Sequence, residues 1–121
     1  MAVQRDPRLL YGAEIRQRIL DDVADDISRL GKRRKVGRLV SVGIGDVEEI
    51  AVYIRGQARA AAAVGLPFDQ QHWSADLTQD ECKRRLVEMN DDPDILGVIL
   101  QRPVPAHVNV RSLQSAIHPL K

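Results

Sequence analysis

The sequence predicts an α/β fold in one domain, residues 1–121, arranged as a three-layer sandwich in which helices flank a short, mainly parallel sheet. Amphipathic segments with apolar residues at spacings of three and four alternate along the chain with short apolar segments. The strongest of those short segments are rich in Val, Ile and Leu, which is typical of strands buried on both faces of a parallel sheet. Aromatic residues make up only 3% of the chain, so we expect an aliphatic core.

The first half of the chain predicts a helix, a strand and a second helix. Apolar residues at helical spacing define the first helix, Ala13–Leu30. The segment "RLVSVGIG", residues 38–45, is a β-branched run ending in glycine, which indicates a buried strand followed by a tight turn. A second helix runs from about Val47 to Val64, with Asp46 as its expected N-cap and Gly65 as its C-terminal glycine.

The second half predicts two more strands, each followed by a helix. Phe68–Ser74 alternates between two faces and indicates a more exposed strand. The segment "TQDE", residues 78–81, has the pattern of a capping box and opens a helix that extends to about Met89. Ile95–Gln101 has the strongest strand pattern, and the prolines after it take the chain out of the sheet. A last short helix lies in the segment from Val110 onward and is stopped by Pro119.

Composition and charge exclude several classes of function. The chain has 18 basic and 17 acidic residues, a net charge of +1, which provides no general field to attract nucleic acid. No apolar run approaches the roughly 18 residues of a membrane span, and the first residues lack the apolar middle of a signal peptide. We therefore expect a cytoplasmic protein without nucleic-acid or membrane partners. Cys82 is the single cysteine, which excludes an internal disulfide.

Neither a metal site nor a dinucleotide site is expected. The three histidines are not spaced as zinc ligands. Asp91, Asp92 and Asp94 lack the glycine and the distal glutamate of a calcium loop, so they predict a polar turn. The segment "GIGDVEE", residues 43–49, lacks the third glycine of a dinucleotide-binding loop, and its acidic side chains would repel a pyrophosphate.

One small group of side chains is a candidate site. Tyr53 and Gln57 lie four residues apart in the second predicted helix, so both project from the same helix face. Gln101 ends the last predicted strand, and ligands of parallel sheets bind beyond the carboxyl ends of the strands. By themselves these three residue types are also compatible with a packed tyrosine and two solvated amides.

The order and spacing of four segments resemble the catalytic domain of the bifunctional methylenetetrahydrofolate dehydrogenase/cyclohydrolase family. The segments are "LYGAEIRQRILDDVADDI", "VGIGDVEEIAVYIRGQARAAAAVGL", "LGVILQRPVP" and "IHPLK". Three features carry the resemblance: the tyrosine eight residues after Gly45, the Gln-x-Pro-x-Pro segment at Gln101–Pro105, and the Ile-His-Pro at Ile117–Pro119. The resemblance covers the chain from about Leu10 to its last residue and implies the α/β fold described above.

The resemblance also implies roles for individual residues. Tyr53 matches the tyrosine that stacks on the folate rings, and Gln101 matches the glutamine that supports the catalytic lysine. That lysine falls on Gln57, which has no titratable proton, so proton transfer at this position is lost while a neutral hydrogen bond remains possible. Pro103 belongs to the same substrate-binding segment. Arg102, where the family usually has leucine, either contacts a carboxylate such as the folate glutamate tail or is solvated.

The resemblance and these departures leave three hypotheses of function. The pterin-binding aspartate and the NADP-binding half of the family have no counterpart here, so no cofactor is expected to bind this chain itself. The first hypothesis is a stand-alone relative that binds a tetrahydrofolate derivative or similar ring ligand, either by itself, with a partner chain or as a homo-oligomer. The second is an inactive interaction module (a pseudoenzyme) that docks on a full-length folate enzyme, with Leu120 and a sheet edge exposed. The third is residual cyclohydrolase activity, a hydrolase reaction of one-carbon metabolism.

Overall fold

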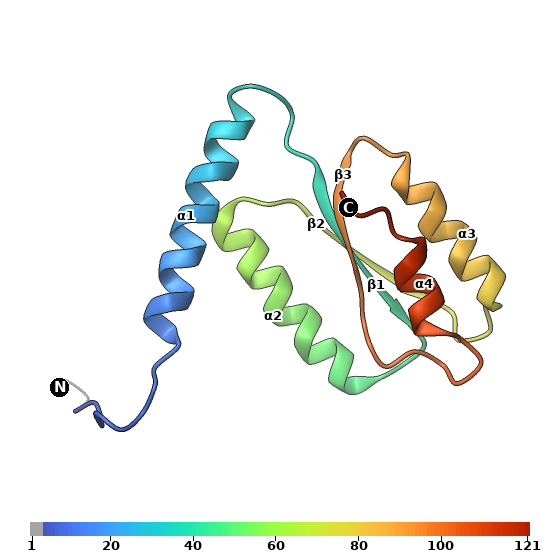
Figure 1. Ribbon diagram of the computed structural model, residues 1–121, viewed down its shortest axis with the longest axis horizontal. Coiled ribbons are helices and arrows are strands. Elements are labelled where there is room, and N and C mark those ends of the chain that lie inside the picture. The colour runs from blue at the N-terminus through green and yellow to red at the C-terminus, as the bar shows by residue number, and fades with distance from the viewer. Residues whose placement is uncertain (1–3) are drawn as a thin grey trace.

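The computed structural model describes residues 4–121 and has the predicted α/β architecture. Helices α1 and α2 lie on one side of the sheet and α3 and α4 on the other, with α1 packed against α2 (Figure 1). The fold class expected from the alternating patterns is therefore confirmed. In chain order the elements are α1 (Ala13–Gly31), β1 (Arg38–Ile44), α2 (Glu48–Val64), β2 (Phe68–Trp73), α3 (Gln79–Asn90), β3 (Ile95–Leu100) and α4 (Val110–Ala116).

The sheet has three parallel strands in the order β2-β1-β3. Leu39 to Ile44 of β1 pair in unbroken register with Phe68 to Trp73, and β3 pairs along the other edge of β1. The chain leaves β1 through α2 on one face, whereas it leaves β3 toward α4 on the opposite face (Figure 1). Adjacent strands whose connections diverge in this way open a crevice at their carboxyl ends. In this fold that place lies between the ends of β1 and β3.

The main apolar core lies between the sheet and the pair α3 and α4. Alternate residues of β1 point to this face and are fully buried, as the period of two in a strand requires. They pack against buried side chains of α3 and α4 and against Trp73, which ends β2. The buried members of this cluster are Val40, Val42, Ile44, Trp73, Cys82, Leu86, Met89, Ile95, Val108 and Leu113.

The opposite face of the sheet is built from smaller and more polar side chains. Leu39, Ser41 and Gly43 are the β1 residues on this face, and Ser41 and Gly43 are buried. A Cβ atom at Gly43 would lie 3.7 Å from Ile50 and 3.9 Å from Ile54, so α2 packs closely over the middle strand. This close approach brings the side chains of α2 down to the ends of the strands.

The sequence patterns predict a capping residue at three helix ends, and two of these predictions are confirmed. Gly65 ends α2 with a φ of 77°, which confirms it as the C-terminal glycine. Thr78 and Glu81 form the expected capping box at the start of α3. The expectation for Asp46 is wrong, because Val47 occupies the N-cap position and the helix has no side-chain cap. Asp46 lies one residue too early and contacts His72 instead.

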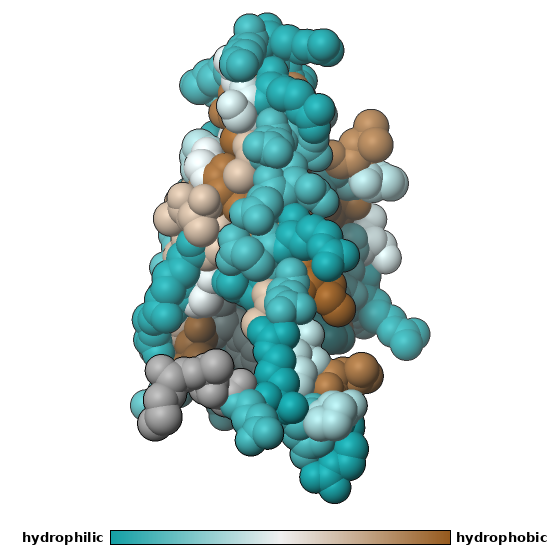
Figure 2. All heavy atoms as spheres, turned by 90° about the vertical axis from the view of Figure 1, so that its left-hand side faces the viewer, coloured by the Kyte–Doolittle hydropathy of each residue, from teal (hydrophilic) through white to brown (hydrophobic). Residues whose placement is uncertain are grey.

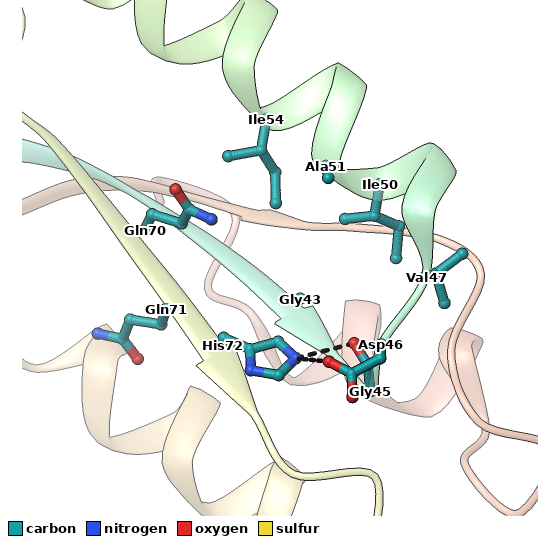
Figure 3. Close-up of a pocket in the computed structure, with 10 residues that line it drawn as sticks. All are labelled: Gly43, Gly45, Asp46, Val47, Ile50, Ala51, Ile54, Gln70, Gln71 and His72. Carbon is teal, nitrogen blue, oxygen red and sulfur yellow. Dashed lines mark hydrogen bonds and ion pairs between the residues drawn. The ribbon is translucent and has the colours of Figure 1, made fainter.

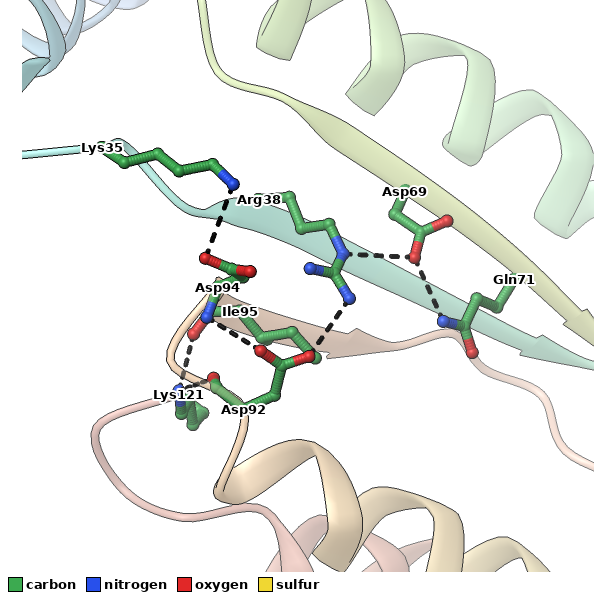
Figure 4. A network of polar contacts seen from close by, with 8 residues as sticks. All are labelled: Lys35, Arg38, Asp69, Gln71, Asp92, Asp94, Ile95 and Lys121. Carbon is green, nitrogen blue, oxygen red and sulfur yellow. Dashed lines mark hydrogen bonds and ion pairs between the residues drawn. The ribbon is translucent and has the colours of Figure 1, made fainter.

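Charged side chains link the amino ends of the strands, away from the crevice (Figure 4). Arg38 lies 3.6 Å from a carboxylate oxygen of Asp69 and 3.4 Å from one of Asp92. The Nζ atom of Lys121 donates to the backbone oxygens of Asp92 and Ile95, at 2.8 and 2.6 Å. The side chain of Asp92 also accepts a hydrogen bond from the backbone N–H two residues later, as a polar turn requires. The aspartates of this segment therefore form the predicted turn.

The capping box gives a first prediction. The Thr78→Ala variant is expected to lose about 1 kcal/mol of unfolding free energy, because the hydroxyl that accepts from the N–H of Glu81 is removed. Urea unfolding followed by circular dichroism measures the change. Ser115→Ala, at an exposed position of α4, is the matched control and should cost little. Equal losses in the two variants would contradict the role of the cap.

The same contact predicts a dependence on pH. Hydrogen bonds from the backbone N–H and then the hydroxyl of Thr78 lower the pKa of Glu81. Because its pKa is lower in the folded chain, this group stabilises the fold above the ordinary glutamate pKa of about 4.3, and the stabilisation is lost as the pH falls through the folded value. Acidification should therefore destabilise the parent chain more than the Glu81→Gln variant. Parallel losses from pH 7 to about 3 would contradict this prediction.

Candidate functional site

Gln101 places a buried amide at the carboxyl end of the sheet. Its backbone N–H donates to the carbonyl of Val42 over 2.9 Å, so the β3 ladder extends to this residue. Its side chain is only 6% exposed and lies on the α2 face, because Val98 and Leu100 already point to the core on the other face. A buried amide needs partners for its polar atoms, and both come from other elements.

The partners of Gln101 join three elements into one hydrogen-bonded chain. Its Nε2 donates to Ser41 Oγ of β1 over 2.8 Å and to Gln57 Oε1 of α2 over 2.6 Å. Both N–H bonds of this amide are therefore used, which fixes its orientation. Since Gln57 accepts through its oxygen, its NH₂ group points away from Gln101, and within residues 4–121 it has no hydrogen-bond partner. That NH₂ group is free to donate to a ligand.

Tyr53 lies one turn before Gln57 on the same flank of α2, and it is 68% exposed. Tyr53 is therefore not a core residue. Exposed aromatic faces of this kind can stack on flat ring compounds. The helix thus presents a stacking surface and a hydrogen-bond donor next to each other, above the end of β3.

The segment after Gln101 lines a depression of its own. Arg102 and Pro103 are both exposed and are joined by a cis peptide bond. Together with Val104 and Val110 they line an open depression of about 440 Å³. This size falls within the usual range of small-molecule sites. No carboxylate of residues 4–121 forms an ion pair with Arg102, so its guanidinium remains available to an anionic group.

A second cavity lies on the opposite flank of α2, between this helix and β2 (Figure 3). Val47, Ala51 and Ile54 line its helix side, and its volume is about 140 Å³. At its mouth His72 Nε2 lies 3.0 Å from the carbonyl oxygen of Gly45 and 3.2 Å from a carboxylate oxygen of Asp46. A cavity of this volume is smaller than the usual sites of small molecules.

Sequence reasoning missed two of these side chains. Ser41 gives only a weak signal, a single hydroxyl in an apolar strand, and its partner is distant in the sequence. The contact of His72 with Asp46 depends on the parallel pairing that places Gly43 opposite His72. Neither contact follows from local spacing.

Tyr53, Gln57 and Gln101 lie at the same corner of the fold, where Gln57 and Gln101 are in direct contact.

Other kinds of site receive no support from the residues that the structure describes. Over residues 4–121 no group of three or more His, Cys, Asp or Glu side chains is placed to bind a metal ion. In the same range no helix combines the length and the apolar character needed to cross a membrane. Cys82 is fully buried in the core, and burial raises the pKa of its thiol, so it is a packing residue.

Comparison with known proteins finds a matching family and similar individual proteins. Residues 10–121 match the family described as tetrahydrofolate dehydrogenase/cyclohydrolase, catalytic domain. The bifunctional protein FolD 3 of Roseobacter denitrificans is 62% identical over 117 residues, which cover 97% of this chain and 39% of that protein. The bifunctional protein FolD 2 of Ruegeria pomeroyi is 56% identical over 121 residues, or 100% of this chain and 40% of that protein. The chain thus spans about 40% of the length of these relatives.

Solved structures share the fold. The bifunctional enzyme FolD of Campylobacter jejuni superposes with a TM-score of 0.87 at 21% identity, covering 91% of this chain and 39% of that one. The Trypanosoma brucei enzyme, complexed with NADP and an inhibitor, superposes with a TM-score of 0.81 at 24% identity, covering 92% and 38%. These likenesses concern the fold, whereas the match over residues 10–121 shows that the chain belongs to the tetrahydrofolate dehydrogenase/cyclohydrolase family and corresponds to its catalytic domain.

Proposed function

We propose that this chain binds a reduced folate or a similar ring compound of one-carbon metabolism in the crevice at the ends of β1 and β3. The observation that carries the proposal is the hydrogen-bonded chain from Ser41 through Gln101 to Gln57, with the exposed Tyr53 beside it. Membership of the family and the curated relatives named for bifunctional folate enzymes support the choice of ligand class.

In this proposal each side chain has a separate task. Tyr53 stacks on the flat ring system, and the NH₂ group of Gln57 donates to a carbonyl or ring nitrogen of the ligand. Gln101 holds Gln57 in place through the contact of 2.6 Å. Arg102 and Pro103 flank the ligand, and the guanidinium attracts a carboxylate such as a glutamate tail. The ligand is then recognised by side chains from two turns of α2 and from the end of β3.

The chemistry of Gln57 favours binding over hydrolysis. Hydrolysis of a methenyl bridge needs a group that moves a proton to or from the reacting atoms, and an amide does not titrate near neutral pH. Within residues 4–121 no carboxylate or imidazole is hydrogen-bonded to Gln57 or Gln101 that could replace it. Residual cyclohydrolase activity is therefore the weaker proposal. The family resemblance places a catalytic lysine at this position. The glutamine found here would account for a chain that binds folate but has little activity of its own.

Ligand binding gives the test of the proposed function. Calorimetric titration with tetrahydrofolate and its methylene and methenyl forms should show binding that weakens about tenfold in Tyr53→Ala, because ring stacking is lost. Val52→Ala, at the neighbouring position that is 61% exposed, is the matched control and should bind like the parent. If the parent chain neither releases heat nor gains thermal stability at millimolar ligand, the folate proposal fails. The inactive interaction module would then be the better explanation.

Restoring the lysine tests the role of position 57. Gln57→Lys is expected to keep the fold and to hydrolyse methenyltetrahydrofolate faster than the parent. The fold should tolerate it, because Ser41 can donate its hydroxyl proton when Gln101 turns its oxygen toward the new ammonium group. Absorbance of the methenyl form measures the rate, with Gln114→Lys on the exposed part of α4 as control. A variant that binds the ligand without hydrolysing it would show that the lysine alone does not restore activity.

A further inference from the structure

Ser41 carries a fully buried hydroxyl whose hydrogen-bonding capacity is only partly used. Its Oγ atom accepts from Gln101 Nε2 over 2.8 Å, and the side chain has no exposed surface. Within residues 4–121 the hydroxyl proton is donated to no acceptor. These contacts lie inside the molecule beneath α2, whereas the outer side of α1 is largely hydrophilic, with apolar atoms between the charged side chains (Figure 2). A buried donor without a partner is uncommon, so the unused proton needs an explanation.

The two glutamines provide that explanation, because an amide can exchange the places of its two polar atoms. A half-turn about the Cγ–Cδ bond puts the oxygen where the NH₂ group was, while the shape of the side chain stays almost the same. If Gln101 turns in this way, its oxygen can accept from the hydroxyl of Ser41. It can also accept from Gln57, provided that Gln57 turns as well. The contacts of 2.8 and 2.6 Å are then kept, with donors and acceptors exchanged.

The two arrangements contain the same number of hydrogen bonds among these three side chains. In the first arrangement Gln101 donates twice through its NH₂ group, and in the second it accepts twice through its oxygen. Each arrangement leaves one capacity of the buried hydroxyl unused, either its proton or its oxygen. The two are therefore close in free energy, and a ligand that binds one of them better shifts the pair toward it.

We propose that Ser41 is a positioning residue that lets Gln57 present either its NH₂ group or its oxygen to a ring ligand. This inference rests on the proposed function of the crevice and defines its ligands more closely. In the first arrangement Gln57 donates to a ring carbonyl, and in the second it accepts from a ring amino group. The crevice then binds the oxo and the amino form of the same fused pyrimidine with similar affinity. A lysine at position 57 would favour the oxo form, since an ammonium group has no acceptor.

The hydroxyl of Ser41 makes the exchange possible, because it can donate as well as accept. Without a hydroxyl at position 41, the first arrangement would leave a buried N–H of Gln101 with no acceptor. In the second arrangement the oxygen of Gln101 would still accept from Gln57, so no donor would lose its partner. Leaving a buried donor unpaired is costly. An apolar side chain at position 41 should therefore hold the two amides in the second arrangement.

Two ligands that differ in the polarity of one ring edge test the proposal. In tetrahydroaminopterin an amino group replaces the pyrimidine carbonyl of tetrahydrofolate. Calorimetric titration of the parent chain should give dissociation constants for the two compounds within about threefold of each other. Ser41→Val should bind tetrahydrofolate about tenfold more weakly and tetrahydroaminopterin as the parent does, because only the first arrangement loses a partner. Ser41→Thr has nearly the shape of valine and keeps the hydroxyl, so it should keep the parent's ratio. Ser41→Ala adds no atoms and should repeat the valine result if valine disturbs the packing.

A measurement without ligand separates the failure of this inference from the failure of the proposed function. Ser41 reaches Gln57 only through Gln101. The side-chain amide signals of Gln57 in the nuclear magnetic resonance spectrum should therefore shift in Ser41→Val and stay near the parent's in Ser41→Thr. If they shift while neither compound binds, the exchange of the amides is supported and the folate ligand is overturned. If both compounds bind in the same ratio to the parent and to the valine, alanine and threonine variants, or if the signals do not respond, the role of Ser41 is overturned.

Discussion

Burial of the middle strand on both faces is the constraint on which the structure depends. Val40, Val42 and Ile44 are fully buried beneath α3 and α4, and Ser41 is fully buried beneath α2. Parallel sheets occur almost only where both faces are covered, because their strands carry apolar side chains on both sides. The order β2-β1-β3 satisfies this requirement with connections on opposite faces. The crevice at the carboxyl ends is a consequence of the same arrangement.

The two faces of the sheet have different tasks. The face under α3 and α4 holds the continuous apolar core and supplies most of the burial. The face under α2 includes a serine and a glutamine whose polar atoms satisfy one another. An unpaired amide in this place would cost about 1–3 kcal/mol, so the contact between Gln101 and Ser41 is a condition for burying either. The polar pair also sets the position of Gln57, which ties the candidate site to the fold.

Membership of the folate-enzyme family and the amide at position 57 are the two observations on which the proposed function rests. The family match covers residues 10–121, yet the chain spans about 40% of its curated relatives. Within residues 4–121 the crevice presents an exposed aromatic ring and an amide NH₂ group without a hydrogen-bond partner, and Arg102, next to Gln101 in the chain, forms no ion pair. It has no titratable side chain hydrogen-bonded to the two glutamines within residues 4–121. We propose for this reason that the crevice holds a ligand rather than transfers its protons.

The sequence alone determined the class of fold, the order of its elements and two of the helix ends, because apolar periodicity, Gly65 and the Thr78 capping box act locally. It also predicted that Tyr53, Gln57 and Gln101 share one site, and in the structure Gln57 and Gln101 are in direct contact. It misplaced the cap of α2, since the backbone conformation at Val47 decides where that helix begins. Only the tertiary structure decided that Ser41 supports Gln101 and that none of the side chains of α1 is buried. Both depend on how separate elements pack, and local spacing carries no information about that packing.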